Sequence, residues 1–425
     1  MMNEAPASPP GPSQLSHESP GAASGSSFWH KYFHRWINSV YFQRISLIHR
    51  ERLAGTGPVL YLGLHRNGAV DGFVYRHVLR KPVFMISTQL RKNWFARLFF
   101  HGIAVTRTRD EGDRDLNDTA RRRCLEHLRV GGELFVFPEG TSSLGPRHLP
   151  FKSGAAWLLL DYLEGGGPPL RVIPLGIHYE CPWTFRGRVE VVVGMPISTE
   201  LPMAASRIAR LRTVKRRIQS ALEEVGINVP ADAYQEMIQR FAGVAVLGTG
   251  RSYFKSLKAM ERAVPEEILD SWRGLEPDLH NAKLWFHQGV PMFYARPLAL
   301  SMAALLVISP MVLAAMALNL PALAAGWWAG RKFPDDRNVI SLWKILVGVP
   351  VFTLWAGVVV VVLVGLGQIW WPALYATITW LGLKLYHRFK KLIVAVHNGL
   401  SHPALRPRML AFHQTVLHSL PDETI

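Results

Sequence analysis

A histidine and an aspartate, His65 and Asp71, have the residue types and the spacing of a general base and the acid that orients it. They follow the apolar residues 58–64, which predict a short buried strand. A carboxylate that accepts a hydrogen bond from one imidazole nitrogen fixes the tautomer of the ring and leaves the other nitrogen free to take a proton. The same residues also fit a loop histidine beside an aspartate that caps a helix, here one expected over residues 72–80.

The sequence Phe-Pro-Glu-Gly-Thr over residues 137–141 is a second candidate for chemistry. Its proline ends a predicted strand, Gly140 permits a tight turn, and Glu139 lies at the carboxyl end of the strand. Ligands bind at that edge of open α/β sheets. We therefore expect Glu139 to accept a hydrogen bond from a substrate hydroxyl or to hold an arginine, and the backbone N–H groups of Gly140 and Thr141 to be available to an anion.

Two basic residues are candidates for binding a phosphate group. Arg107 ends a predicted strand over residues 102–107 and offers a bidentate guanidinium, a role that Arg109 could also take. Lys152 lies near the start of an apolar helix and adds a point charge.

The elements that must position these residues form an α/β domain. Strands alternate with helices from Val59 to Pro196, which predicts a largely parallel sheet flanked by helices. The predicted strands occupy residues 58–64, 82–87, 102–107, 133–137, 170–179 and 189–193. Residues 28–52 mix aromatic and basic side chains, which is typical of an amphipathic helix at a membrane surface and equally of a helix that packs its aromatics on a core.

The C-terminal third of the chain has the pattern of membrane helices. Residues 297–330 and 345–383 contain no charged side chain, and each segment exceeds the ~20 residues that span a bilayer. Four tryptophans lie near their ends, as at membrane interfaces, at positions 327, 328, 370 and 371. We expect a membrane hairpin, in which the second segment can contain a third, half-length pass near Pro372. A buried pair of soluble helices is the alternative.

The net charge and the cysteines indicate the class of partner, and the patterns along the chain indicate the domain organisation. The chain has 48 Lys and Arg against 31 Asp and Glu, a net charge of +17 that favours anionic partners. Cys124 and Cys181 form no metal-ligand cluster, so no metal is expected. The expected units are a disordered N-terminus (1–27), an α/β domain (28–226), a helical region (227–294), transmembrane helices (295–386) and a basic tail (387–425).

Four of these motifs occur in the order of the motif blocks of glycerolipid acyltransferases, which acylate glycerol 3-phosphate or lysophosphatidate. The blocks are His65 to Asp71, Gly102 to Arg107, Phe137 to Thr141 and Val172 to Pro174. The resemblance covers residues 42–197, and its most specific part is Phe-Pro-Glu-Gly-Thr followed by Pro-Phe-Lys-Ser-Gly-Ala. Five residues separate the histidine from the aspartate where the family usually has four, a form that resembles the yeast-type glycerol-3-phosphate/dihydroxyacetone-phosphate acyltransferases. The second block is one residue shorter than usual, which is why Arg109 is an alternative to Arg107.

The resemblance implies that His65 takes the proton of an acceptor hydroxyl that attacks an acyl thioester, with Asp71 orienting the ring. The substrate-binding residues that it implies are Arg107, Glu139, Gly140, Thr141 and Lys152. It also implies phospholipid biosynthesis by an integral membrane protein whose catalytic domain faces the cytoplasm. Its partners would be membrane lipid, acyl-CoA or acyl-carrier protein as co-substrate without a further cofactor, and a phosphorylated glycerol acceptor, glycerol 3-phosphate first.

Two other functions fit parts of the sequence. One is acyl transfer to lysophosphatidate, another lysolipid, or a non-phosphorylated acceptor. The other is a non-catalytic scaffold that binds anionic lipid through residues 28–52 and the basic helix expected at 203–225, although a scaffold does not explain histidine, arginine and glutamate at successive strand exits. Nucleic-acid binding is not expected, since the sequence contains no recognition module.

Overall fold

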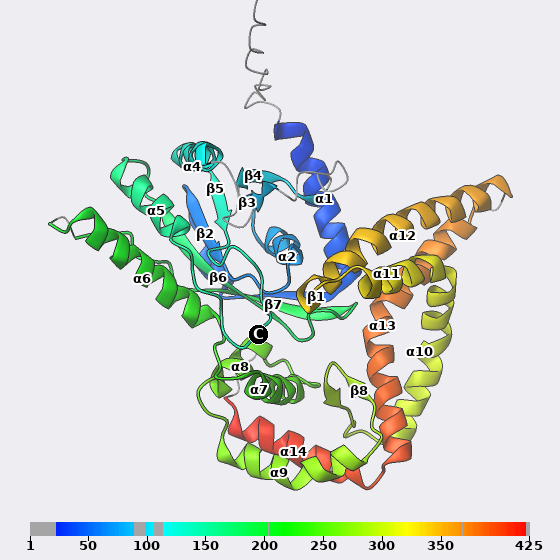
Figure 1. Cartoon of the computed structure of the whole chain (residues 1–425). Helices are drawn as coiled ribbons and strands as arrows, with labels where there is room; N and C mark the ends of the chain where they lie inside the picture. The colour runs from blue at the N-terminus through cyan, green and yellow to red at the C-terminus, as the bar shows by residue number, and fades with distance from the viewer. Residues whose placement is uncertain (1–22, 89–98, 106–113, 203, 368, 422–425) are drawn as a thin grey trace, which may run out of the picture.

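The computed structural model describes residues 23–88, 99–105, 114–202, 204–367 and 369–421 (Figure 1). Its centre is a seven-stranded sheet in the order β1-β7-β6-β2-β5-β3-β4. All neighbours are parallel except β6 and β7, so the predicted largely parallel α/β sheet is confirmed. The strands are β1 (Phe42–Ile48), β2 (Val59–Gly63), β3 (Val83–Ser87), β4 (Gly102–Val105), β5 (Glu133–Val136), β6 (Arg171–Tyr179) and β7 (Gly187–Val193).

Six of the seven strands lie where the apolar runs predicted them, and β1 does not. The prediction of one helix over residues 28–52 is wrong, because α1 (Ala23–Tyr41) ends at Tyr41 and β1 and the short helix η2 (Arg50–Leu53) follow. β1 pairs with β7, a strand far along the chain, so its partner is invisible to local periodicity. Helix α1 also begins inside the segment 1–27 that we expected to be disordered; residues 1–22 lie outside the described residues.

Helices cover both faces of the sheet, as parallel sheets require. On one face, α1 and α2 (Val70–Val78) bury aromatic and aliphatic side chains together with residues of a later helix, α12 (Ile340–Gly365). On the other face lie α4 (Arg114–Arg129), α5 (Gly154–Glu164) and α6 (Arg207–Val225), as Figure 1 shows. The basic helix expected at 203–225 is therefore a core-packing helix, with Val214, Ile218 and Leu222 buried against the sheet.

The C-terminal end of α6 docks closely on β6. A Cβ atom added to Gly176 would lie 2.1 Å from the carbonyl oxygen of Val225, the last residue of α6. Beside it, Nε2 of His178 lies 2.9 Å from the same carbonyl, and its ring packs on Phe254. Burial lowers the pKa of His178 from 6.5 to about 3, so the ring is neutral and donates to Val225 near neutral pH.

The helical region and the expected basic tail form one core. The region contains α7 (Asp232–Ala245), α8 (Tyr253–Met260), α9 (Glu266–Asn281) and the hairpin of β8 (Phe286–His287) and β9 (Val290–Pro291). Helix α14 (Leu405–Ser419) buries Met409, Phe412 and Val416 in the same hydrophobic cluster. Residues 387–425 are thus not a separate tail, because α13 (Trp371–Ser401) also runs unbroken across the expected boundary at residue 386.

The apolar C-terminal segments form more helices than the sequence indicated. Residues 297–330 contain α10 (Leu298–Leu318) and the short α11 (Leu320–Lys332), because the helix breaks at Asn319 before Pro321. After the short helix η5 (Arg337–Val339) come α12 (Ile340–Gly365) and α13. Two spans, Leu298–Leu318 and Arg337–Gly365, are long and apolar enough to cross a membrane by length and composition. In the apolar windows of these spans, 17% and 11% of the residues are buried inside the protein.

The contact between α6 and β6 predicts that Gly176→Ala destabilises the protein. Its methyl group meets a backbone carbonyl that side-chain rotation does not move, which costs about 1–3 kcal/mol. We expect the midpoint of thermal unfolding in detergent, followed by tryptophan fluorescence, to fall by several degrees. Gly274→Ala on α9 is the matched control, because nothing lies within 4 Å of its added methyl group and the midpoint should stay the same or rise. Equal midpoints in both variants would contradict the close packing of Gly176.

His178 predicts a loss of stability on acidification. Because its folded-state pKa lies below 6.5, the unfolded chain binds a proton first as the pH falls, so stability is lost from about pH 6.5 towards pH 3. His178→Gln keeps a neutral donor for Val225 and should lose less stability than wild type between pH 7 and pH 5, by up to about 2 kcal/mol. The exposed His280→Gln should follow wild type. If the thermal midpoint depended on pH in the same way in all three proteins, His178 would not be the cause of the loss of stability.

Candidate active site

His65 lies two residues beyond the last residue of β2, at the carboxyl end of the parallel strands. Its Nδ1 is 2.9 Å from Oδ2 of Asp71, and its ring stacks on Phe137 with centroids 4.1 Å apart. The backbone N–H of His65 donates to Oε1 of Glu139 at 2.8 Å. With only 7% of the residue exposed, the ring is fixed by one hydrogen bond and one stacking contact while it borders a cavity. This arrangement leaves Nε2 as the nitrogen that can exchange a proton.

The Asp71 carboxylate is fully buried and accepts four hydrogen bonds. Besides His65, Oδ2 accepts from the backbone N–H groups of Arg66 at 2.6 Å and Asn67 at 2.8 Å. Oδ1 accepts from the hydroxyl of Tyr179 at 2.6 Å. Tyr179 ends β6, and nothing in its local sequence signalled this role. Its hydroxyl remains a donor at neutral pH, because burial and the nearby Asp71 charge hold its pKa well above 10.

The five-residue spacing between His65 and Asp71 is accommodated by a turn and an early helix start. Gly68 adopts a positive φ of 55°, and α2 begins at Val70, two residues before the expected start. Asp71 is therefore not the N-cap of this helix: it lies in the first turn, and its carboxylate turns back onto the preceding loop. The alternative of a loop histidine beside a capping aspartate does not describe this geometry.

Glu139 has a different position from the one expected of a substrate ligand. It is 1% exposed, and its carboxylate accepts backbone N–H groups from His65 and, at 3.1 Å, from Leu149. Burial raises the pKa of Glu139, and the two backbone hydrogen bonds and the nearby Arg66 oppose that shift. Glu139 therefore ties the His65 backbone to the loop before α5; the expected contact with Arg107 falls on a residue outside the described ones.

The turn at Gly140 uses the N–H group that we expected to bind an anion. Gly140 has a positive φ of 70° and donates its N–H to the carbonyl of Phe137 at 3.0 Å. The Lys152 ammonium lies over Gly140, where an added Cβ would be 2.8 Å away, and the side chain is exposed. Of these residues, Thr141 lines the cavity beside His65, whereas Gly140 and Lys152 are not among the described residues that line it.

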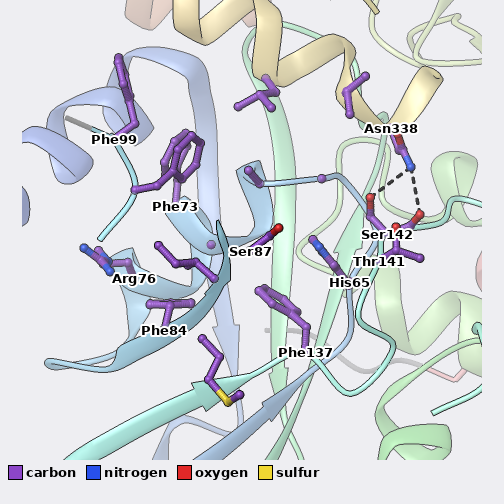
Figure 2. Close-up of a pocket in the computed structure, with 18 of the residues that line it drawn as sticks. His65, Phe73, Arg76, Phe84, Ser87, Phe99, Phe137, Thr141, Ser142 and Asn338 are labelled. Atoms are coloured by element: carbon purple, nitrogen blue, oxygen red, sulfur yellow. Dashed lines mark hydrogen bonds between the residues drawn. The ribbon is translucent and has the colours of Figure 1, made fainter. Parts of the chain in front are cut away.

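The cavity beside His65 has a volume of about 680 Å³, within the usual range of ligand sites (Figure 2). Phe73, Phe84, Phe99 and Phe137 give it aromatic walls, as Figure 2 shows. Such walls suit an extended apolar chain, and the histidine at one edge places a proton acceptor next to that space.

The cavity is lined by both positively and negatively charged side chains. The Arg76 guanidinium lies 5.0 Å from the centre of the Phe84 ring and donates to the carbonyl of His101 at 3.1 Å. Burial lowers the pKa of Arg76 to about 10, so the side chain is still cationic at neutral pH. Asp335 and Asp336 line the cavity on the side of α12. Arg76 is thus a described cation available for an anionic group, and its sequence neighbourhood gave no sign of it.

One wall of the cavity comes from the C-terminal apolar helices. Asn338 donates from Nδ2 to the carbonyl and the hydroxyl oxygens of Ser142, at 3.0 and 3.1 Å (Figure 2). Val339 and Leu342 line the same space. The segment before α12 therefore closes the site and fixes the turn that follows Glu139, a contact that the sequence motifs do not reveal.

The expected phosphate ligands Arg107 and Arg109 lie outside the described residues. Strand β4 ends at Val105 and leads into that segment. The structure thus brings His65 and Thr141 to the cavity, with Asp71 bonded to His65, whereas Glu139, Gly140 and Lys152 are not among the described residues that line it. It adds Arg76 and Asn338 to the lining and Tyr179 as a second side-chain partner of Asp71.

Part of the chain is similar to known proteins. Residues 44–178 match the family model described as Acyltransferase. Over 263 residues the chain is 25% identical to an uncharacterized acyltransferase of Schizosaccharomyces pombe, covering 53% of this chain and 38% of that protein. The 1-acyl-sn-glycerophosphate (LPA) acyltransferase PlsC of Thermotoga maritima is similar at 19% identity and a TM-score of 0.34, over 47% of this chain and 78% of that chain.

The matched segment runs from β1 into β6 and contains the histidine, the aspartate and the Phe-Pro-Glu-Gly-Thr turn that form the site. This chain spans 38% of the length of that curated relative. Residues 44–178 thus match an acyltransferase domain, in agreement with the resemblance of the sequence motifs to glycerolipid acyltransferases.

Proposed function

We propose that this protein transfers an acyl group from acyl-CoA or acyl-carrier protein to a hydroxyl of glycerol 3-phosphate, at a membrane. The observation that carries the proposal is the hydrogen bond between His65 and the fully buried Asp71 at the edge of an aromatic cavity. A family acyltransferase needs a proton acceptor, a space for the acyl chain and a cation for the phosphate. His65, the phenylalanine walls and Arg76 supply candidates for all three.

In the proposed reaction, Nε2 of His65 takes the proton of the acceptor hydroxyl while its oxygen attacks the thioester carbonyl. The new bond is the C–O bond of the ester, and the C–S bond breaks. The imidazolium returns its proton to the leaving thiolate, so neutral histidine is regenerated. Asp71 holds the ring with Nδ1 protonated and stabilises the transient positive charge. No covalent acyl-enzyme is needed.

Glycerol 3-phosphate is the proposed acceptor because of the five-residue spacing between His65 and Asp71 and the nearby cations. Arg76 is the described cation in the cavity, and Arg107 follows β4 in sequence. Lysophosphatidate or another lysolipid is a second candidate, favoured by a specific observation: Val339 and Leu342 in the wall belong to the apolar span Arg337–Gly365. An acceptor that carries an acyl chain could reach the site along this helix.

We further propose that α10 and α12 anchor the protein in a bilayer, with the catalytic domain facing the cytoplasm, where its water-soluble substrates are made. The low burial of the two apolar spans supports this, since a soluble core would enclose them. Asn338 in η5, directly before α12, contacts Ser142, which supports placing this end of the span on the catalytic side.

Substitutions of Asp71 and of its hydrogen-bond donor Tyr179 should show whether these residues act by orienting His65 or only by stabilising the fold. In Asp71→Asn, the amide N–H₂ group would face N–H and O–H groups that also donate, so the side chain could no longer hold His65 as the carboxylate does. We expect kcat to fall at least about 100-fold. Tyr179→Phe removes one donor and should lower kcat about tenfold. The control is Tyr75→Phe, whose buried hydroxyl donates to the carbonyl of Leu64 and not to Asp71. A loss as large for Tyr75→Phe as for Tyr179→Phe would argue against a positioning role.

Acyl transfer by the purified protein in detergent tests the function itself. Labelled acyl-CoA is the donor, and glycerol 3-phosphate, dihydroxyacetone phosphate and lysophosphatidate compete as acceptors. We expect product from glycerol 3-phosphate and a loss of about 10²–10⁴-fold in His65→Ala. Product chiefly from lysophosphatidate would keep the mechanism and discard the proposed acceptor. Full activity in His65→Ala would overturn the mechanism, and no transfer by wild type with either donor would favour a non-catalytic scaffold.

A further inference from the structure

A second large cavity, of about 650 Å³, lies among the apolar helices and away from His65. Residues of α10, α11, α12 and α13 form its walls, and the loop at residues 183–185 of the acyltransferase domain closes one side. No step of the proposed reaction uses it. Its volume falls within the range of cavities that hold small molecules.

The cavity exists because the helices pack as two tight pairs. Helix α10 pairs with α13 through Ala315 and Gly382, where an added Cβ on the glycine would lie 2.1 Å from the alanine methyl. Helix α11 pairs with α12 through Gly326 and Gly348, whose backbones approach closely enough that a Cβ on one would be 3.3–3.6 Å from the Cα of the other. Small residues allow this close approach inside each pair and leave a space between the pairs.

The walls of the cavity are mainly apolar. Its hydrophobic lining includes Val312, Met316, Leu323, Val349, Phe352 and Leu383. The polar Asn319 in the wall is already satisfied, since it accepts from Tyr375 and donates to Thr379. An occupant would therefore fill most of this space with hydrocarbon.

Two lysines make one side of the cavity cationic. Lys344 donates to the carbonyl of Trp183 at 2.7 Å, and Lys390 to the carbonyl of Phe185 at 3.4 Å. An ammonium group has three N–H donors, so each lysine keeps two for another acceptor. No aspartate or glutamate is among the described residues that line this cavity.

Two arginines next to the cavity strengthen its positive charge. Arg331 stacks over Trp327 at 4.1 Å from the ring centre, and Arg337 lies 5.9 Å from the ring centre of Trp183. Both tryptophans line the cavity. Tryptophan beside basic side chains is the pattern that proteins present to the headgroup level of a bilayer.

We propose that this cavity binds an anionic glycerophospholipid of the surrounding bilayer, with an acyl chain between the two helix pairs and the phosphate at Lys344 and Lys390. The proposal rests on the membrane placement given under the proposed function, and not on the identity of the acceptor. The first turns of α12 lie between the two cavities, because Leu342 lines the catalytic one and Lys344 this one. A bound lipid would brace the helix that forms a wall of the active site.

Lipid retention by the full-length protein tests the proposal. The purified protein is incubated in detergent micelles containing equimolar phosphatidylglycerol and phosphatidylcholine, separated by gel filtration, and its retained lipids are quantified by mass spectrometry. We expect about tenfold enrichment of phosphatidylglycerol, because two basic side chains contact its phosphate without a choline group to offset the charge. The double variant Lys344→Gln/Lys390→Gln should lose this enrichment.

Two controls separate lipid binding from folding. Lys344→Arg/Lys390→Arg keeps both charges and should retain the enrichment. Lys384→Gln removes an exposed lysine from α13 that does not line the cavity, and should also retain it. Equal retention of the two lipids by wild type, or the same loss in Lys384→Gln as in the double glutamine variant, would overturn the proposal. Acyl transfer measured on the same samples reports on the proposed function separately, since a protein that selects phosphatidylglycerol but transfers no acyl group would refute that function alone.

Discussion

The buried charge of Asp71 is the constraint around which the site is built. A carboxylate without solvent exposure costs several kcal/mol unless hydrogen bonds replace its water. Four donors replace it here: the ring of His65, two backbone N–H groups of the following loop, and the hydroxyl of Tyr179. Because these donors come from the exit of β2, the loop before α2 and the end of β6, the carboxylate joins three elements of the sheet's carboxyl edge at one point.

A second buried carboxylate holds the backbone of His65. Glu139 accepts the backbone N–H of His65 and that of Leu149, so the strand exits of β2 and β5 are tied together. Glu139, which the sequence suggested as a substrate ligand, therefore supports the backbone of His65. Desolvation and backbone hydrogen bonds act in opposite directions on its pKa, which is the balance expected of a carboxylate held inside a scaffold.

The cavity beside His65 and the apolar helices share a wall. Asn338 fixes the turn at Ser142, and Val339 and Leu342 close the cavity, so the first turns of α12 belong both to the site and to a span long enough to cross a membrane. The cationic cavity around Lys344 lies on the other side of these turns. A family domain confined to residues 44–178 would lack this wall.

The sequence by itself determined the features that depend on local residue pattern, namely the strands and one pair of site residues. Apolar runs located six strands, and the spacing of His65 and Asp71 identified the pair that the fold brings within hydrogen-bond distance. Only the tertiary structure decided which groups complete the site, because its donors and walls are separated by long stretches of chain. Tyr179 reaches Asp71 across 108 residues, and Asn338 reaches Ser142 across 196. Periodicity reports which face of an element is apolar, whereas such contacts arise when sheet order and helix packing bring distant segments together.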